Sequence, residues 1–310
     1  MIKSLISGLV KKNIIDLAKS ITIVENRSSG YKELLSELSP SEKKCHKIGI
    51  TGPPGSGKST LTNALCKKII KQNKKVGVIC VDPSSPFQGG AILGDRIRMK
   101  DLNPTDVFIR SFSSRGSLGG LSQSILNVES LYESFGFDVI VYETVGVGQI
   151  ELDIVDICDT LLLCLTPESG DEIQMMKSGL LECCDVIAIN KSDRDGADRL
   201  KISLQQIFDI SSKIWTAPII NTVGIKDLGI NKLLLEIEGH YKFLSSNNDL
   251  KNKVKSRYIS KLKNLAQEYL LDSFFNNERE QLIEDELSKD DVDRISVYSL
   301  FEKIKYLDEK

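Results

Sequence analysis

The chain has 310 residues, of which 41% are hydrophobic and 27% charged, and its formal net charge is −2. This length and composition fit a soluble globular protein with one core of about 200–250 residues and an accessory segment. The balanced charge gives no basic excess for nucleic acid or an anionic membrane. The sequence contains no run of about 18 apolar residues, so it predicts no transmembrane helix. We therefore expect a cytoplasmic protein that binds neither nucleic acid nor membrane.

The first 44 residues have apolar positions at helical spacing and predict an N-terminal helical extension. Their opening, residues 1–12, is basic and mildly apolar. It is too short and too interrupted for a signal peptide, so we expect it to form the first helix of the folded protein.

From residue 46 onward, short apolar runs alternate with amphipathic segments, which predicts a mainly parallel sheet covered by helices on both faces. The predicted strands are 47–51, 76–81, 107–109, 139–142, 160–165, 186–190 and 218–221. The predicted helices are 58–72, 121–135, 172–181, 199–210 and 230–244. A polar break at 245–249 then separates a domain at 45–245 from helices at 246–310, which contain neither Gly nor Pro.

The strongest motif follows the first predicted strand and opens the first helix of this domain. It fits the phosphate-binding pattern G-x-x-x-x-G-K-[ST], in which backbone N–H groups surround the phosphates. We expect Lys58 to contact the β- and γ-phosphates and Ser59 to bind Mg²⁺. The nucleotide-binding residues predicted here are Gly52, Pro53, Pro54, Gly55, Ser56, Gly57, Lys58, Ser59 and Thr60. The fold is then a three-layer α/β P-loop domain with helical extensions at both ends.

A second motif, Asn190-Lys191-Ser192-Asp193, directly follows a predicted strand and indicates a guanine-binding site. The Asp193 carboxylate can accept hydrogen bonds from guanine N1–H and N2–H, a pair of donors that adenine lacks. We expect the Lys191 stem to pack along the base. Backbone groups of Thr222, Val223 and Gly224, after the next strand, are candidates for contacting the guanine O6.

Acidic residues between these motifs are candidates for binding Mg²⁺. Asp82 ends a predicted strand, Asp95 lies in a Gly-rich loop with Arg98, and Glu143 ends the strand before Gly146. Carboxylates at such strand ends face a bound nucleotide, and the Gly146 N–H is placed to sense the γ-phosphate. The alternatives are a helix N-cap for Asp82 and a surface ion pair for Asp95. Arg98 is a candidate for stabilising charge on the phosphate, with an ordinary surface residue as the alternative. Gln149 is a candidate for orienting the attacking water.

With these motifs, the chain resembles the methylmalonyl-CoA mutase-associated GTPases of the MeaB/ArgK type. The matching stretches run in order through residues 15–240: 18–26, 52–59, 81–85, 89–99, 114–120, 143–149, 170–174 and 190–193. The resemblance implies a homodimeric, GTP- and Mg²⁺-binding protein that chaperones an adenosylcobalamin-dependent acyl-CoA mutase, gating cofactor delivery and protecting the mutase. It also implies a partner-responsive loop at 168–179, including Lys177, and dimerisation through the C-terminal helices.

The chain departs from the family pattern in two places. Residues 167–170 read Pro-Glu-Ser-Gly instead of a Gly-Ala-Gly-like run, and the C-terminal helices lack a Trp-rich segment, since Trp215 is the only tryptophan.

Other functions stay open from sequence alone. A small-molecule or amino-acid-transport-linked kinase is disfavoured by the guanine motif. A metallochaperone GTPase usually has Cys/His metal sites, whereas this chain has seven scattered cysteines, no Cys-x-x-Cys and two histidines. A nucleotide-insensitive scaffold conflicts with the intact Lys58 and Ser59. The cysteines predict reduced thiols of a cytosolic core, with a thiol switch at Cys183-Cys184 as the alternative.

Overall fold

A computed structural model describes residues 1–38, 45–82, 106–113, 123–144, 150–168, 179–209 and 214–305. It divides into two compact units, Met1–Val254 and Lys255–Lys310.

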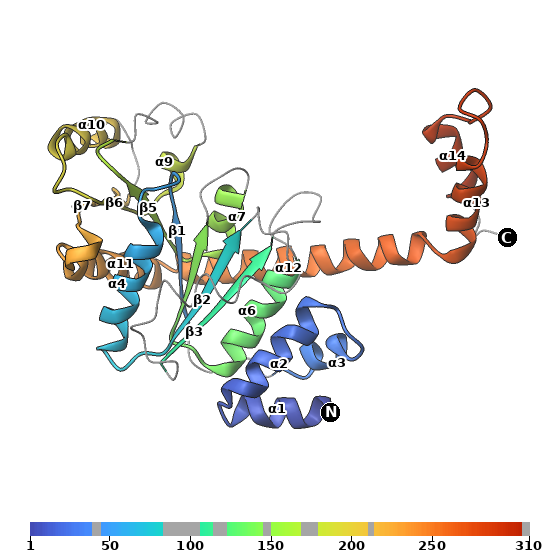
Figure 1. Ribbon diagram of the computed structural model, residues 1–310, viewed down its shortest axis with the longest axis horizontal. Coiled ribbons are helices and arrows are strands. Elements are labelled where there is room, and N and C mark those ends of the chain that lie inside the picture. The colour runs from blue at the N-terminus through green and yellow to red at the C-terminus, as the bar shows by residue number, and fades with distance from the viewer. Residues whose placement is uncertain are drawn as a thin grey trace. The chain divides into compact units, whose positions relative to one another are not determined.

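The first unit is built on a seven-stranded sheet, in which each strand runs parallel to its neighbours. The order is β3 (Val107–Ser113), β2 (Val76–Asp82), β4 (Val139–Thr144), β1 (His46–Thr51), β5 (Thr160–Leu165), β6 (Val186–Ile189) and β7 (Ile219–Asn221). β1 lies in the middle, between β4 and β5 (Figure 1). Since all strands run the same way, the loops that follow them meet at one edge of the sheet.

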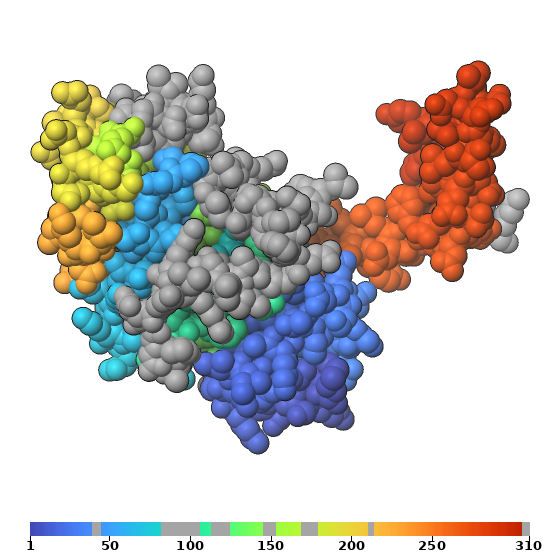
Figure 2. All heavy atoms as spheres, in the orientation of Figure 1, coloured from blue at the N-terminus to red at the C-terminus, as the bar shows by residue number. Residues whose placement is uncertain are grey.

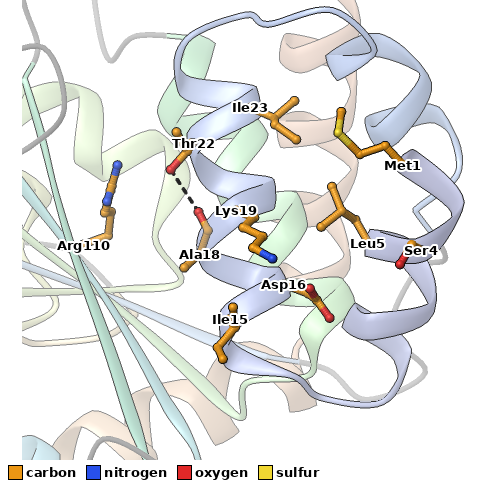
Figure 3. Close-up of a pocket in the computed structure, with 10 residues that line it drawn as sticks. All are labelled: Met1, Ser4, Leu5, Ile15, Asp16, Ala18, Lys19, Thr22, Ile23 and Arg110. Carbon is orange, nitrogen blue, oxygen red and sulfur yellow. Dashed lines mark hydrogen bonds between the residues drawn. The ribbon is translucent and has the colours of Figure 1, made fainter.

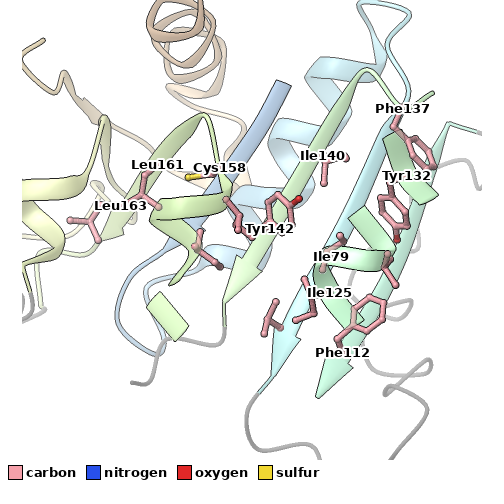
Figure 4. Close-up of a cluster of buried hydrophobic side chains, with 14 of the residues drawn as sticks. Ile79, Phe112, Ile125, Tyr132, Phe137, Ile140, Tyr142, Cys158, Leu161 and Leu163 are labelled. Carbon is pink, nitrogen blue, oxygen red and sulfur yellow. The ribbon is translucent and has the colours of Figure 1, made fainter. Parts of the chain in front are cut away.

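Helices cover both faces of this sheet and bury alternate residues of each strand, as the period of two requires. On one face, Ile79, Ile140 and Leu163 pack with α6 (Gln123–Phe135), α7 (Ile150–Ile157) and α10 (Ala197–Asp209) (Figure 4). On the other, Val78, Val141 and Leu162 pack with α4 (Lys58–Ile70) and α11 (Ile230–Ser246). The predicted three-layer α/β fold is confirmed.

The N-terminal residues form α1 (Ile2–Val10), α2 (Ile14–Glu25) and α3 (Tyr31–Ser36). Leu9, Leu17 and Ile21 are fully buried and join the same apolar core as α6. An ion pair of 2.6 Å between Arg110 of β3 and Glu25 also connects these helices to the sheet. They form a contiguous lobe on the surface (blue in Figure 2).

The C-terminal helices are α12 (Asp249–Phe274), α13 (Asn277–Leu287) and α14 (Val297–Ile304). Within the second unit, the buried Arg279 guanidinium donates to the carbonyls of Ile304 (2.8 Å) and Phe274 (3.1 Å) and lies 4.5 Å from the Phe274 ring centre. The helix α11 ends at Ser246 and α12 begins at Asp249, so the chain leaves the helix within the polar segment 245–249.

Two helices of the first unit, α7 and α9, differ from the sequence prediction. The helix α7 was not predicted. Most of the helix predicted at 172–181 lies outside the described residues, and the described helix in this region, α9, spans Leu180–Cys183. None of the seven cysteines, all of which the structure describes, forms a disulfide. The Cys184 thiol is buried and donates to the Leu181 carbonyl. Among the described residues, no helix has the length and apolarity to cross a bilayer.

Candidate functional site

The loop between β1 and α4 folds tightly enough to require glycine at two positions. Gly52 has a φ of 140°, and a Cβ there would lie 2.1 Å from the Cys164 carbonyl oxygen of β5. Gly57 has a φ of 90°, and its Cβ would lie 2.3 Å from the Asn190 side-chain nitrogen. Both conformations are unfavourable for other residues, so the predicted P-loop geometry has a physical cause in the neighbouring strands.

Lys58 begins α4, and its side chain turns back over this loop. The ammonium is bonded to the carbonyls of Gly52 (2.7 Å) and Pro53 (3.0 Å), and the residue is 6% exposed. The loop also contains the Ser56 hydroxyl, which is buried without a hydrogen-bond partner. A buried cation and an unpaired hydroxyl inside a loop at a helix N-terminus suit an anionic group such as phosphate.

Ser59 and Glu143 meet across the sheet edge although they are far apart in sequence. The Ser59 hydroxyl donates to the Glu143 carboxylate at 2.5 Å, and Glu143, near the end of β4, is 8% exposed. A hydroxyl and a carboxylate oxygen are the hard ligands that Mg²⁺ takes in nucleotide sites. These two residues therefore fit the predicted metal site.

Asn190 ties the P-loop to the segment after β7. Its side-chain amide donates to the Ser56 carbonyl (2.9 Å), while its oxygen accepts from the backbone N–H of Gly224 (3.1 Å) and the hydroxyl of Thr222 (3.4 Å). Thr60 lies against the same segment, since a Cβ on Gly224 would be 3.2 Å from the Thr60 methyl. The candidate guanine loop at Thr222, Val223 and Gly224 is thus held beside the P-loop.

The remaining residues of the guanine motif lie beside the same loop. Lys191 has a φ of 55° and donates to the Gly55 carbonyl at 2.7 Å, so its stem extends towards the P-loop. Asp193 is exposed and accepts from the Lys226 ammonium at 2.8 Å. The hydrogen bond from Lys226 holds the pKa of Asp193 below its usual value. The carboxylate therefore stays charged, as hydrogen bonding to guanine requires.

Comparison with known proteins agrees with this geometry. The family described as "Methylmalonyl Co-A mutase-associated GTPase MeaB" matches residues 17–279. The chain belongs to this family.

Individual relatives extend the match. A putative GTPase of Pyrococcus horikoshii is 44% identical over 85% of both chains. GTPase ArgK of Escherichia coli is 34% identical over 84% of this chain and 82% of its own. The mitochondrial methylmalonic aciduria type A homolog of Mus musculus is 32% identical over 87% of this chain and 70% of its own. A crystal structure of an LAO/AO transport system kinase covers 100% of this chain and 98% of that one with a TM-score of 0.72. At 24% identity this likeness establishes the fold alone.

Several predicted site residues of this MeaB-family chain lie outside the described residues: Asp95, Arg98, Gly146, Gln149 and Lys177. Asp82 is the last residue of β2, which pairs with β4 in the register Cys80 to Glu143. Its backbone therefore lies at the same edge as Glu143. Pro53 and Pro54 lie in the P-loop, where Pro53 supplies a carbonyl to Lys58.

Three contacts at this edge were not predicted. Lys226 pairs with Asp193, and Arg194 donates to both carboxylate oxygens of Glu168. The Cys164 thiol, whose pKa burial raises to about 11, donates to the Ser56 carbonyl at 3.4 Å. No sequence motif predicts these contacts, because each one joins two segments that are distant in sequence and involves a surface or core residue outside the GTPase motifs.

Both histidines lie at the opposite edge of the sheet, where the strands begin. The Thr160 hydroxyl is 3.0 Å from His46 Nε2 and 3.0 Å from His240 Nδ1, and His240 Nε2 is 3.3 Å from the Asp185 carboxylate. This buried network joins β1, β5 and α11. It lies apart from the P-loop edge and explains both histidines as structural residues.

A cavity of about 690 Å³ also lies away from the P-loop, against α1, α2 and β3 (Figure 3). It is lined by Met1, Ser4, Leu5, Ile15, Asp16, Ala18, Lys19, Thr22, Ile23 and Arg110. No residue of the P-loop or of the guanine motif contributes to this lining, so the cavity is separate from the nucleotide site.

Proposed function

We propose that the chain is a Mg²⁺-dependent GTPase that serves as the chaperone of an adenosylcobalamin-dependent acyl-CoA mutase. The observation that carries the nucleotide part is the meeting of Lys58, the Ser59–Glu143 pair and Asn190–Asp193 at one sheet edge. Membership of the MeaB family supports both GTP hydrolysis and the mutase partner. The reaction converts GTP and water to GDP and phosphate.

The residues of the P-loop edge have distinct roles in this proposal. The Lys58 ammonium exchanges its contacts with the Gly52 and Pro53 carbonyls for phosphate oxygens and offsets their charge. Ser59 and Glu143, with Asp82 and Asp95, would hold Mg²⁺, which neutralises charge on the phosphates. Catalysis then depends mainly on positioning and charge stabilisation.

Three further residues complete the proposed chemistry. Asp193 accepts the two guanine donors, Arg98 stabilises charge that develops on the phosphate, and Gln149 orients the attacking water. Hydrolysis by such a constellation needs no covalent intermediate on the protein.

The partner-related part of the proposal rests on family membership. We infer that the protein forms a homodimer through residues 246–310, gates delivery of the cobalamin cofactor and protects the mutase. The loop at 168–179 would report the nucleotide state to the mutase. It follows β5, so it begins at the nucleotide edge of the sheet.

The test measures GTP hydrolysis with and without an adenosylcobalamin-dependent acyl-CoA mutase from the same organism. The mutase is expected to accelerate hydrolysis by the unmodified protein. Lys177→Ala should keep the intrinsic rate and lose most of this acceleration, because Lys177 acts only when the mutase places the loop against the nucleotide. Full acceleration in the variant would remove Lys177 from the switch, and no acceleration of the unmodified protein would contradict the chaperone role.

A further inference from the structure

Among the described side chains, Lys226 is the one that forms an ion pair with Asp193, whose carboxylate is proposed to bind guanine. Its ammonium lies 2.8 Å from one oxygen, Oδ2, of Asp193. Lys226 belongs to none of the motifs that define a GTPase. It lies at the end of a short 3₁₀ turn, η1 (Gly224–Lys226), directly after the candidate guanine loop.

Backbone hydrogen bonds hold the segments that carry both partners of this ion pair. Val223 and Leu228 exchange backbone hydrogen bonds of 3.1 and 3.3 Å around the turn that carries Lys226. The neighbouring Asp227 also pairs with Lys68 of α4 at 3.4 Å. These contacts hold the turn at its two ends and against α4, so they define the backbone position from which the Lys226 side chain extends.

The Asp193 side is fixed as well. The Ser192 N–H and hydroxyl both bond to the Thr222 carbonyl at 3.1 Å, and the Arg194 N–H bonds to the Lys191 carbonyl at 3.0 Å. The two loops are thus joined through Ser192 and Thr222 independently of the ion pair. The Lys226 ammonium and the Asp193 carboxylate therefore meet between two loops that other hydrogen bonds already hold together.

The Asp193 carboxylate has enough acceptor positions to bond to Lys226 and to guanine at the same time. An ionised carboxylate accepts about four hydrogen bonds, and Lys226 contacts only Oδ2. Guanine N1–H and N2–H need two acceptor positions. The ammonium and the base can therefore share the carboxylate, with Lys226 restricting the rotation of the Asp193 side chain before the base arrives.

From this geometry, we propose that Lys226 is a positioning residue for guanine recognition that acts through Asp193. The inference rests on the proposed function, since it requires Asp193 to bind the base. The contribution is moderate, because both side chains are exposed and exposed ion pairs are weak. We expect Lys226→Met to weaken GDP binding about three- to tenfold, while Lys226→Arg keeps most of the affinity.

A double-mutant cycle on nucleotide affinity tests this inference in the full chain. GDP and xanthosine diphosphate are titrated, in Mg²⁺, against the parent, Lys226→Met, Asp193→Asn and the double variant. If Lys226 acts through Asp193, Lys226→Met weakens GDP binding by the parent but has no effect on either nucleotide in the Asp193→Asn background. The matched control is Lys232→Met, which removes the same charge from an exposed position on α11.

The outcomes separate the inference from the function on which it rests. Unchanged or tighter GDP binding by Lys226→Met, or an equal loss in both Asp193 backgrounds, overturns the role of Lys226. An equal loss with Lys232→Met overturns it too, because that result indicates a general charge effect. If Asp193→Asn itself leaves GDP affinity unchanged, the base-reading role of Asp193 fails first.

Discussion

Asn190 is the residue on which the geometry of the site depends most. It is 3% exposed and bonds to the P-loop through Ser56 and to the guanine loop through Gly224 and Thr222. Asn190→Ala leaves the Ser56 carbonyl and the Gly224 N–H without these partners. We expect the free energy of unfolding to fall by about 2–4 kcal/mol, and GDP affinity to fall with it.

Denaturant unfolding followed by the fluorescence of Trp215, the only tryptophan, measures this change. Asn231→Ala is the matched control, because Asn231 is an exposed residue of α11. An equal free energy of unfolding in the two variants would show that the Asn190 hydrogen bonds do not contribute to stability.

Residues of the site differ in how far sequence predicts them. Lys58, Ser59, Asn190 and Asp193 belong to motifs whose spacing reflects phosphate and base chemistry, so they can be predicted without a structure. Lys226 cannot, because its role comes from the Asp193 contact made across two loops. The roles assigned to Asp95, Arg98, Gln149 and Lys177 stay predictions, since these residues lie outside the described part of the chain.

At the scale of elements, the strand ends opposite the nucleotide site contain a pH-sensitive network. Burial, as the largest cause, lowers the pKa of His46 and His240 to about 3. In the unfolded chain both rings titrate near 6.5. Unfolding therefore takes up protons below that pH, and stability should fall as pH drops from 6.5 by up to about 1.4 kcal/mol per pH unit for each ring.

His240→Gln should reduce the slope of unfolding free energy against pH between 6.5 and 5. The comparison with the parent isolates this ring from the carboxylates, which titrate at lower pH in both proteins. Parallel slopes would mean that His240 accepts a proton in the folded state.

The helix α12 carries an apolar stripe that supports the proposed homodimer. Tyr258, Leu262, Leu265 and Tyr269 are 73%, 58%, 44% and 71% exposed, and their spacing of four, three and four residues places them on one helix face. We expect Leu262→Glu with Leu265→Glu to convert the dimer to a monomer, because association would bury the new charges.

Light scattering measures the mass of this variant in solution. Leu235→Glu, at an exposed position of α11, is the control and should leave the dimer intact. A double variant that keeps the mass of a dimer would place the interface away from this stripe.

Element positions in the α/β region follow from hydrophobic period and turn residues. The strand at 160–165 was predicted at its observed bounds, and the other strand predictions overlap the observed strands with shifted ends. The strand predicted at 107–109 extends to Ser113, because Arg110 and Ser111 interrupt the apolar run yet pair in the ladder with β2. The helix α7 begins at Ile150, directly after the 143–149 motif, and was not predicted.

Over the whole molecule, the parallel strand direction is what brings distant motifs together. The P-loop, Glu143, Asn190 and the 222–224 segment follow or end strands β1, β4, β6 and β7. A parallel sheet places all these ends at one edge, so alternation of strands and helices predicts their meeting. The order of the strands depends on pairings among distant segments, and the sequence pattern alone did not provide it.

Mg²⁺-dependent GTP hydrolysis by Lys58→Ala is the most direct test of the central claim that the P-loop edge is the catalytic site. The account predicts that affinity or turnover falls by about tenfold or more relative to the parent, because the ammonium now bonded to Gly52 and Pro53 would no longer reach the phosphates. Lys71→Ala, at the exposed C-terminal end of α4, should leave hydrolysis unchanged. GTP turnover by Lys58→Ala equal to that of the parent would contradict the account.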